Sequence, residues 1–129
     1  MNIDFSKYVV ISKKLLNKPK SNYKHFSFII NKNETLSVGW NNSKKTHPKA
    51  FEYGYPWAYL HSEVSAIIKF PDKPSLFKHC SIINIRLSKF SSKLLLARPC
   101  KLCQKTLIEL GFRSIFYSNE HGLFERLVF

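Results

Sequence analysis

The stretch PCKLCQKTLIELGFRSIFY, residues 99–117, determines how we expect the chain to fold. Its proline suits the first position of a helix, and the helical pattern runs from Cys100 to Leu110 and ends at Gly111, a residue typical of helix C-termini. Residues 113–117 then have the composition of a strand. A dense apolar run at 79–88 predicts another strand just upstream. The resulting strand-helix-strand unit places two parallel strands side by side through a right-handed connection.

The rest of the chain adds further strands and helices on either side of this unit. Periodicity predicts a helix at 5–16, strands at 23–31 and 35–40, a long loop at 41–57, a helix at 58–70 and a last strand at 123–129. The short turn before the last strand allows only an antiparallel hairpin, and the helix at 58–70 is expected to join parallel neighbours. This order predicts an α/β fold of three layers, with a five-stranded mixed sheet, helices on both faces and a C-terminal β-hairpin.

Length and composition limit the number of domains and the classes of protein to which the chain can belong. With 129 residues and 44% hydrophobic side chains, we expect one compact domain spanning 1–129. Apolar runs such as 26–30, 81–85 and 94–97 are much shorter than the roughly 20 residues that cross a bilayer, so no membrane span is expected. The first five residues lack the features of a secretory signal, which predicts a cytoplasmic location where thiols stay reduced.

The charge is strongly unbalanced. Lys and Arg number 21 against 8 Asp and Glu, a formal charge of +13 and a pI near 9.8. Such an excess indicates a polyanionic partner, and Lys44, Lys45 and Lys49 in the long loop are the candidate nucleic-acid contacts. The alternative is a Lys- and Asn-rich proteome, but that bias is expected to enrich acidic residues as well.

Two motifs indicate a metal site. His61-Ser62-Glu63 lies in the helix at 58–70 and spells H-x-E, and Pro99 with Cys100 and Cys103 spells the much rarer P-C-x-x-C. One imidazole and two thiolates suit zinc and leave the fourth tetrahedral position open for water. Zinc lowers the pKa of that water, and Glu63 could then move its protons. Positions two apart lie on different faces of a helix, so His61 and Glu63 cannot both project straight at the metal, and Glu63 has to reach the water laterally.

Other interpretations of the cysteine pair remain open at this point. A closed zinc knuckle needs a fourth protein ligand, for which the candidates are Cys80, His79, His47, His25 and His121. A redox pair of the thioredoxin kind is the other alternative, although the preceding proline and the distant His-x-Glu disfavour it. Cys80 itself lies in an apolar run and is expected to be a buried core residue.

At these two motifs the sequence resembles the zinc-dependent cytidine deaminase-like superfamily, whose signature is H-x-E followed by P-C-x-x-C. The resemblance implies a zinc cofactor held by His61, Cys100 and Cys103, with Glu63 outside the metal shell as the proton shuttle. It also implies that Asn41, or its rival Asn42, contacts a nucleotide sugar. The plain alternative is that both asparagines make a turn.

Two residues depart from the pattern of that superfamily. Ser62 replaces the usual alanine, which is expected to be harmless, and Arg98 stands where serine or glutamate is common and can reshape the pocket. Both are candidate substrate contacts. The further candidates are aromatic side chains that could stack on a base or read a neighbouring nucleotide, namely Trp57, Tyr59 and Tyr117.

The expected reaction is conversion of cytosine to uracil in single-stranded nucleic acid, DNA or RNA. Its first alternative is a deaminase of free cytidine, deoxycytidine or dCMP, which the missing helix between the last two strands favours because that branch of the superfamily also lacks it. Others are an adenine deaminase acting on nucleic acid and a non-catalytic, zinc-stabilised nucleic-acid-binding module. The partner is therefore expected to be single-stranded nucleic acid or a cytosine nucleotide.

Overall fold

The computed structural model describes residues 2–129. In chain order the elements are α1 (Phe5–Lys14), β1 (Lys24–Asn31), β2 (Glu34–Trp40), α2 (Pro48–Glu52), α3 (Ser62–Lys69), the 3-10 helix η1 (Pro74–His79), β3 (Ser81–Leu87), β4 (Leu94–Leu95), α4 (Lys101–Glu109), β5 (Ser114–Ser118) and β6 (Phe124–Arg126). Within these residues, no helix combines the length and the apolar composition needed to span a membrane.

The strands form one mixed sheet in the order β2-β1-β3-β5-β6, with the two-residue β4 paired to β3. This confirms the predicted fold class, and β4 is the strand that periodicity did not reveal. The parallel pairing of β3 with β5 and the antiparallel β5-β6 hairpin are also as predicted.

One predicted pairing is wrong. β2 and β3, the strands before and after α3, are not neighbours, because β1 lies between them and pairs antiparallel with both. The physical reason is that β1 buries five consecutive residues, 26–30, and therefore both of its faces, as expected for a strand inside the sheet with a partner on each edge.

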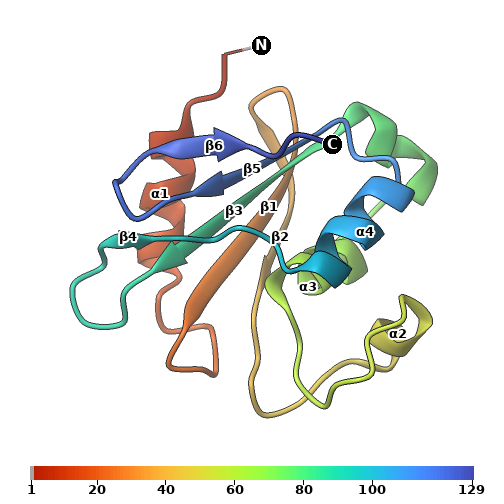
Figure 1. Cartoon of the computed structure of the whole chain (residues 1–129), viewed down its shortest axis with the longest axis horizontal. Helices are drawn as coiled ribbons and strands as arrows, with labels where there is room; N and C mark the ends of the chain where they lie inside the picture. Colours follow the sequence, from red (N-terminus) through yellow and green to blue (C-terminus); the bar gives the residue numbers. More distant parts are fainter. Residues whose placement is uncertain (1) are drawn as a thin grey trace.

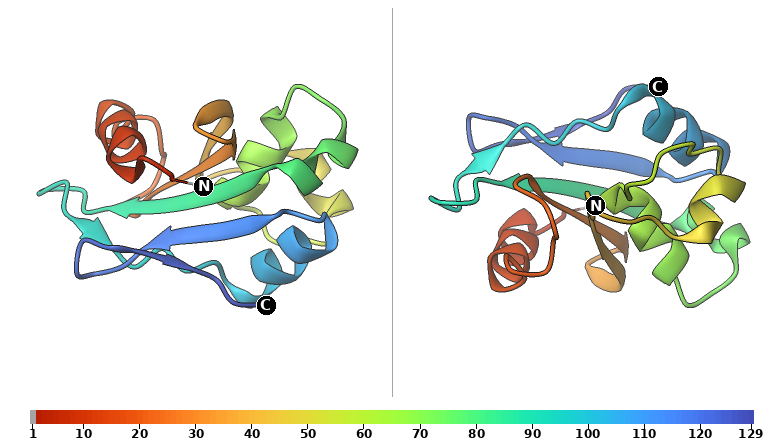
Figure 2. Two further views of the ribbon diagram at one scale, coloured as in Figure 1. Left: turned by 90° about the horizontal axis from the view of Figure 1, so that it is seen from above. Right: turned by 90° about the horizontal axis from the view of Figure 1, so that it is seen from below.

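The sheet is covered on both faces, as expected for three layers. Alternate residues of β1 and β3 point to opposite sides, so Phe28 and Ile83 pack with Tyr8 of α1, whereas Ile29 and Ile82 pack with Ala66 of α3. Figure 1 and Figure 2 show α1 toward one end of the strands and α2, α3 and α4 gathered toward the other.

Two helix starts differ from the prediction. The helix expected from residue 58 begins at Ser62, because Leu60 instead exchanges backbone hydrogen bonds of 2.9 and 2.7 Å with Asn42 and stays extended. The helix expected from Pro99 begins at Lys101, with Cys100 as its N-cap. The long loop also contains the short helix α2 at its centre.

α3 lies unusually close to β2. A Cβ atom added at Gly39 would clash with backbone atoms of Ala66 and Ser62, so only glycine fits at this crossing. Ser37 and Ser65 reinforce the contact, since Ser37 Oγ donates to Ala66 O at 2.7 Å and Trp40 N donates to Ser65 Oγ at 3.3 Å. The position of the first turn of α3 is therefore set by the sheet beneath it.

Candidate active site

Three potential metal ligands meet where α3 and α4 begin. His61 is the N-cap of α3 and Cys100 the N-cap of α4, and both have extended backbone angles. Their donor atoms and Cys103 Sγ all lie within 4.8 Å of one another. Nδ1 of His61 lies 3.4 Å from Cys103 Sγ and 3.9 Å from Cys100 Sγ. Figure 1 shows the first turns of the two helices side by side.

The N-cap position of His61 removes a geometric difficulty. Inside a helix, His61 and Glu63 would project from different faces. Because His61 precedes the first turn, with φ of −78° and ψ of 150°, its ring leaves the chain in a direction that helical spacing does not constrain. Glu63 then enters the same region from the first turn of α3.

The donor set fits zinc with one open position. Soft sulfur ligands and an imidazole are typical of zinc sites, and three protein ligands leave the fourth tetrahedral place for a reacting water. Within residues 2–129, no fourth His, Cys, Asp or Glu joins the three-residue group, which disfavours a closed zinc knuckle. Cys80 is buried elsewhere, where its thiol lies 3.4 Å from Leu76 O.

The two thiols differ electrostatically. Hydrogen bonds from the Cys103 thiol and from His61 lower the pKa of Cys100 to about 4, and the Cys103 backbone N–H contributes from 3.4 Å. The pKa of Cys103 is raised, because its thiol hydrogen-bonds to Cys100 and is buried. Burial acts to lower the pKa of His61, but its hydrogen bond to Cys100 and the charge on Glu63 raise it overall. The hydrogen bonds from Cys103 and His61 therefore favour the thiolate form of Cys100.

Aromatic side chains contact two of the three potential metal ligands, Cys103 and His61. The hydroxyl of Tyr55 donates to Cys103 Sγ at 3.1 Å, and burial raises the pKa of this hydroxyl, so it remains a donor. The ring of Trp57 is nearly parallel to that of His61 at 5.1 Å, and the ring of Tyr59 lies 5.6 Å from His61. These rings restrict the orientation of the imidazole.

Polar contacts in a ring hold the carboxylate of Glu63, and the single hydroxyl proton of Ser62 is donated either to Glu63 Oε1 or to Ser27 Oγ. Asn84 Nδ2 donates to Glu63 Oε2 at 2.9 Å, and Ser27 Oγ donates to Asn84 Oδ1 at 2.7 Å. Ser27 Oγ lies 2.8 Å from Ser62 Oγ, which lies 3.2 Å from Glu63 Oε1. We call these four residues the Glu63 hydrogen-bond ring. Ser27 and Asn84 are register partners on β1 and β3, so the sheet fixes the ring.

Two of the three potential metal ligands, His61 and Cys100, border a pocket of about 410 Å³ together with Glu63. Its wall combines three segments far apart in sequence, residues 21–25, 41–43 and 59–63, together with Ala97, Arg98 and Cys100. Hydrogen bonds join the three segments, because Asn42 pairs with Leu60 and Ser43 N donates to Lys20 O at 3.2 Å. Burial, helped by the charges of Arg86 and His61, lowers the pKa of His25 in this wall to about 4.

Both candidate sugar contacts line the pocket, but their side chains also make local bonds. Asn41 Oδ1 accepts from His25 N at 3.1 Å, and Asn41 Nδ2 donates to Tyr23 O at 2.8 Å. Asn42 Oδ1 accepts from the backbone N–H groups of Lys44 and Lys45 at 2.9 and 3.3 Å. Asn42 therefore makes the turn that sequence reasoning gave as the alternative, and a sugar contact by either residue stays a prediction.

The other predicted contacts divide into two groups. Ser62, Tyr59 and Arg98 line the pocket, and the hydroxyl of Ser62 lies 3.2 Å from Glu63 Oε1, a contact that an alanine side chain lacks. Trp57 and Tyr117 are not among the lining residues. Tyr117 is buried, with its hydroxyl 3.3 Å from Glu125 Oε1 and the guanidinium of Arg98 5.9 Å from its ring centre.

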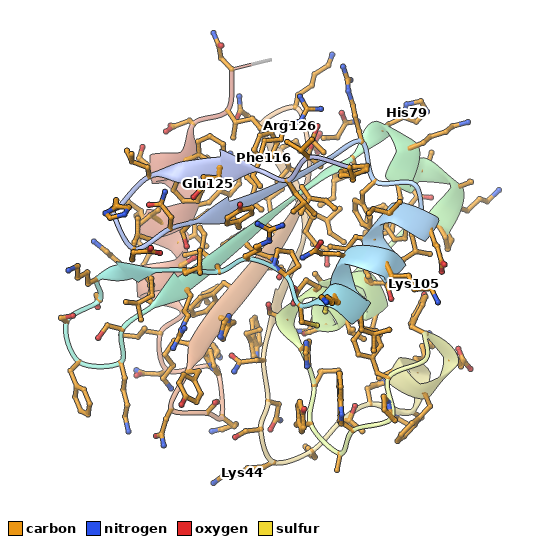
Figure 3. The ribbon with its side chains drawn as sticks, viewed as in Figure 1. Lys44, His79, Lys105, Phe116, Glu125 and Arg126 are labelled. Carbon is orange, nitrogen blue, oxygen red and sulfur yellow. The ribbon has the colours of Figure 1, made fainter. Side chains whose placement is uncertain are left out.

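The three predicted nucleic-acid contacts are exposed. Lys44 and Lys45 directly follow the pocket wall, and Figure 3 shows Lys44 pointing outward from its loop. Lys49 lies in the first turn of α2, where its N–H donates to His47 Nδ1 at 3.1 Å.

Sequence reasoning missed the buried polar partners of the site. Asn84 and Ser27 stand inside strands that are otherwise apolar, and a polar residue in such a strand needs a hydrogen-bond partner. That signal was present in the sequence. The sequence contains no such signal for the hydrogen bond from Tyr55 to Cys103, because this contact depends on where the long loop at 41–57 packs.

Comparisons with known proteins agree with this geometry. A family described as "Cytidine and deoxycytidylate deaminase zinc-binding region" matches residues 4–119. No curated protein sequence matches significantly. Among solved structures, a cytidine deaminase from Burkholderia pseudomallei is similar with a TM-score of 0.61 and 15% identity over 95% of this chain and 90% of that chain. A dCMP deaminase from the cyanophage S-TIM5, in complex with dCMP and dUMP, gives 0.57 and 16% over 88% and 79%.

The match to the family covers nearly the whole chain and includes both zinc motifs, and the residues of those motifs form one His-Cys-Cys group. The two solved structures share the fold at low identity. This chain therefore belongs to the cytidine and deoxycytidylate deaminase family of zinc-binding proteins.

Proposed function

We propose that this protein converts cytosine to uracil by zinc-dependent hydrolytic deamination, with 1–129 acting as one deaminase domain. The observation that carries the proposal is that Glu63 borders the same pocket as the metal ligands His61 and Cys100 while standing outside the ligand group. An acid placed beside a metal-activated water, but not bound to the metal, is free to transfer protons.

The chemistry requires a nucleophile and two proton transfers. Zinc, when bound by His61, Cys100 and Cys103, lowers the pKa of water and makes hydroxide available near neutral pH. Glu63 accepts the proton of the attacking water and gives it to the ring nitrogen N3 as the bond from oxygen to C4 forms. Glu63 then carries the proton of the new C4 hydroxyl to the exocyclic amine, the C4–N bond breaks, and ammonia leaves.

The substrate we propose is cytosine in single-stranded DNA or RNA. The formal charge of +13 supports a polyanion, and in the part of the chain that the structure describes no Lys or Arg forms an ion pair with an acid. The Lys and Arg side chains of the described residues are therefore not neutralised by ion pairs within the protein. Such a surface attracts phosphodiester backbones.

A free nucleoside or nucleotide is the second candidate substrate. It is favoured by the similarity to a cytidine deaminase and to a dCMP deaminase, and by the direct hairpin between β5 and β6. In that case Lys44, Lys45 or Lys49 would bind a single phosphate. Adenine remains chemically possible because the metal chemistry is the same.

The experiment is to incubate the zinc-loaded protein with cytidine, dCMP, single-stranded DNA and RNA, and to measure uracil and hypoxanthine. We expect uracil from a polynucleotide, and no turnover by Glu63→Gln although zinc is retained. Turnover of dCMP alone would defeat the polynucleotide substrate. A zinc-containing protein that deaminates nothing, and whose Glu63→Gln variant binds oligonucleotides unchanged, would instead be a binding module.

A further inference from the structure

Five lysines, here called the basic strip, lie on or next to segments of the pocket wall: Lys20, Lys24, Lys44, Lys45 and Lys89. Hydrogen bonds connect the segments that carry them. Lys89 Nζ donates to Asn22 Oδ1 at 3.2 Å, and Lys24 Nζ donates to Pro19 O at 2.9 Å. Ser43 N and Oγ donate to Lys20 O at 3.2 and 2.6 Å, and Lys44 and Lys45 come next in the chain.

No acid neutralises this strip. Residues 19–25, 41–47 and 86–100 include the strip and part of the pocket wall, and they contain eight Lys and Arg residues but no Asp or Glu. Partial burial and the neighbouring charges of Lys89 and Lys20 lower the pKa of Lys24. Like charges gathered without a counterion destabilise the free protein, and an anionic partner relieves that repulsion.

An exposed aromatic ring lies on the same segment as Lys20 and Lys24 and lines the pocket. Tyr23 lines the pocket and is 60% exposed, with the guanidinium of Arg86 5.0 Å from its ring centre. The backbone at this point is held by Asn41, which bonds to Tyr23 O and His25 N. Tyr23 is therefore an exposed ring on a held backbone, outside the His-Cys-Cys group, and its face could stack on a base.

We propose that Tyr23 and the basic strip form a subsite for the nucleotide next to the target base in a single-stranded polynucleotide. Tyr23 stacks on the flanking base, and the lysines contact successive phosphates. The inference rests on the proposed function and names the substrate class of the same site. A mononucleotide has only one phosphate group and one base, so it does not explain a strip of five lysines with a second stacking ring.

The test measures binding of the full zinc-loaded chain to a fluorescent nine-nucleotide single strand containing one cytosine among thymines, over a range of salt. Tyr23→Ala is expected to weaken binding roughly tenfold, and Tyr23→Phe to restore it. The triple variant Lys20→Gln, Lys24→Gln, Lys89→Gln is expected to reduce the dependence of log Kd on log salt by about 0.7 for each phosphate that the protein no longer neutralises.

The matched control removes the same charge elsewhere, through Lys73→Gln, Lys78→Gln and Lys105→Gln. Figure 3 shows Lys105 on α4, away from the loop that carries Lys44. Equal losses in the two triple variants would mean that only net charge matters, and this would overturn the subsite. Unchanged binding by Tyr23→Ala would overturn it too, even if dCMP is deaminated. If no substrate is deaminated but the Tyr23 and strip variants lose binding selectively, the surface stands and the catalytic proposal fails.

Discussion

The side-chain amide of Asn84 donates a hydrogen bond of 2.9 Å to Oε2 of Glu63, and both groups are buried. Asn84 sits in the middle of β3, in which six of seven residues are buried, and Glu63 lies in the first turn of α3. The bond therefore ties the proposed proton carrier to the sheet. It leaves the carboxylate little freedom to rotate away from the pocket.

Asn84→Ala is expected to lower kcat by roughly tenfold with a smaller effect on KM, because the orientation of Glu63 matters for proton transfer rather than for binding. Steady-state kinetics on the preferred substrate provide the measurement. Asn119→Ala is the matched control, since Asn119 is also buried and hydrogen-bonded but lies in the β5-β6 turn. If both variants lower kcat equally, Asn84 acts only through stability.

The metal group makes a simple prediction about zinc content. The purified protein should contain about one zinc ion per chain, and Cys100→Ser or His61→Ala should lose it, because two remaining ligands hold zinc weakly. Elemental analysis after dialysis measures this. Cys80→Ser removes a buried thiol outside the group and should keep the metal. Retained zinc in Cys100→Ser would show that the ion binds elsewhere.

The sequence predicted the parts of the structure that local pattern determines. The unit β3-α4-β5 and the pair Cys100 and Cys103 follow from periodicity and from a rare motif. By contrast, the extended conformation that makes His61 an N-cap depends on the pairing of Leu60 with Asn42, a contact across the fold. Periodicity within one segment contains no information about such a contact.

The Glu63 hydrogen-bond ring shows the same limit. Ser27 and Asn84 are recognisable as polar residues in apolar strands, but their partnership depends on the register between β1 and β3. The strand pattern at 23–31 does not indicate which strands pair with β1, and only the sheet order shows that β3 is one of its partners. Without that order, two isolated polar residues could not be assigned to Glu63.

Tyr55→Phe is expected to weaken zinc binding by roughly ten- to a hundredfold, because the hydroxyl of Tyr55 hydrogen-bonds to Cys103 Sγ and orients this ligand. Competition with a chromogenic chelator measures the affinity without any substrate. Tyr53→Phe removes a hydroxyl from a neighbouring residue of the same loop and serves as the control. Equal affinities in Tyr55→Phe and the unmodified protein would contradict the role of this hydrogen bond.

Gly39→Ala should destabilise the protein by about 3 kcal/mol or more, because the added methyl group meets the backbone of α3 rather than a flexible side chain. Urea unfolding gives the free energy. At Gly122, φ is +78° and a Cβ meets no atom within 4 Å, so Gly122→Ala should lose only about 1 kcal/mol through backbone strain. Similar losses at the two positions would argue against a close crossing of β2 and α3.

The lowered pKa of His25 predicts how the free energy of unfolding changes in acid. Burial, together with Arg86 and His61, lowers the pKa of its imidazole from 6.5 in the unfolded chain to about 4 in the folded protein. Between these two values the unfolded chain binds a proton that the folded protein does not, so this contribution to stability is present above pH 6.5 and is lost as the pH falls to 4.

The size of the pH effect follows from the shift. A change of this size corresponds to roughly 3 kcal/mol, which should appear as a steeper loss of unfolding free energy in the unmodified protein than in His25→Gln over that range. Comparing the two proteins removes the effect of zinc release in acid, because both have the same ligands. NMR titration of the ring protons of His25 gives the pKa directly. A value near 6.5 would mean that the imidazole is hydrated and that the pocket wall is more open than the structure shows.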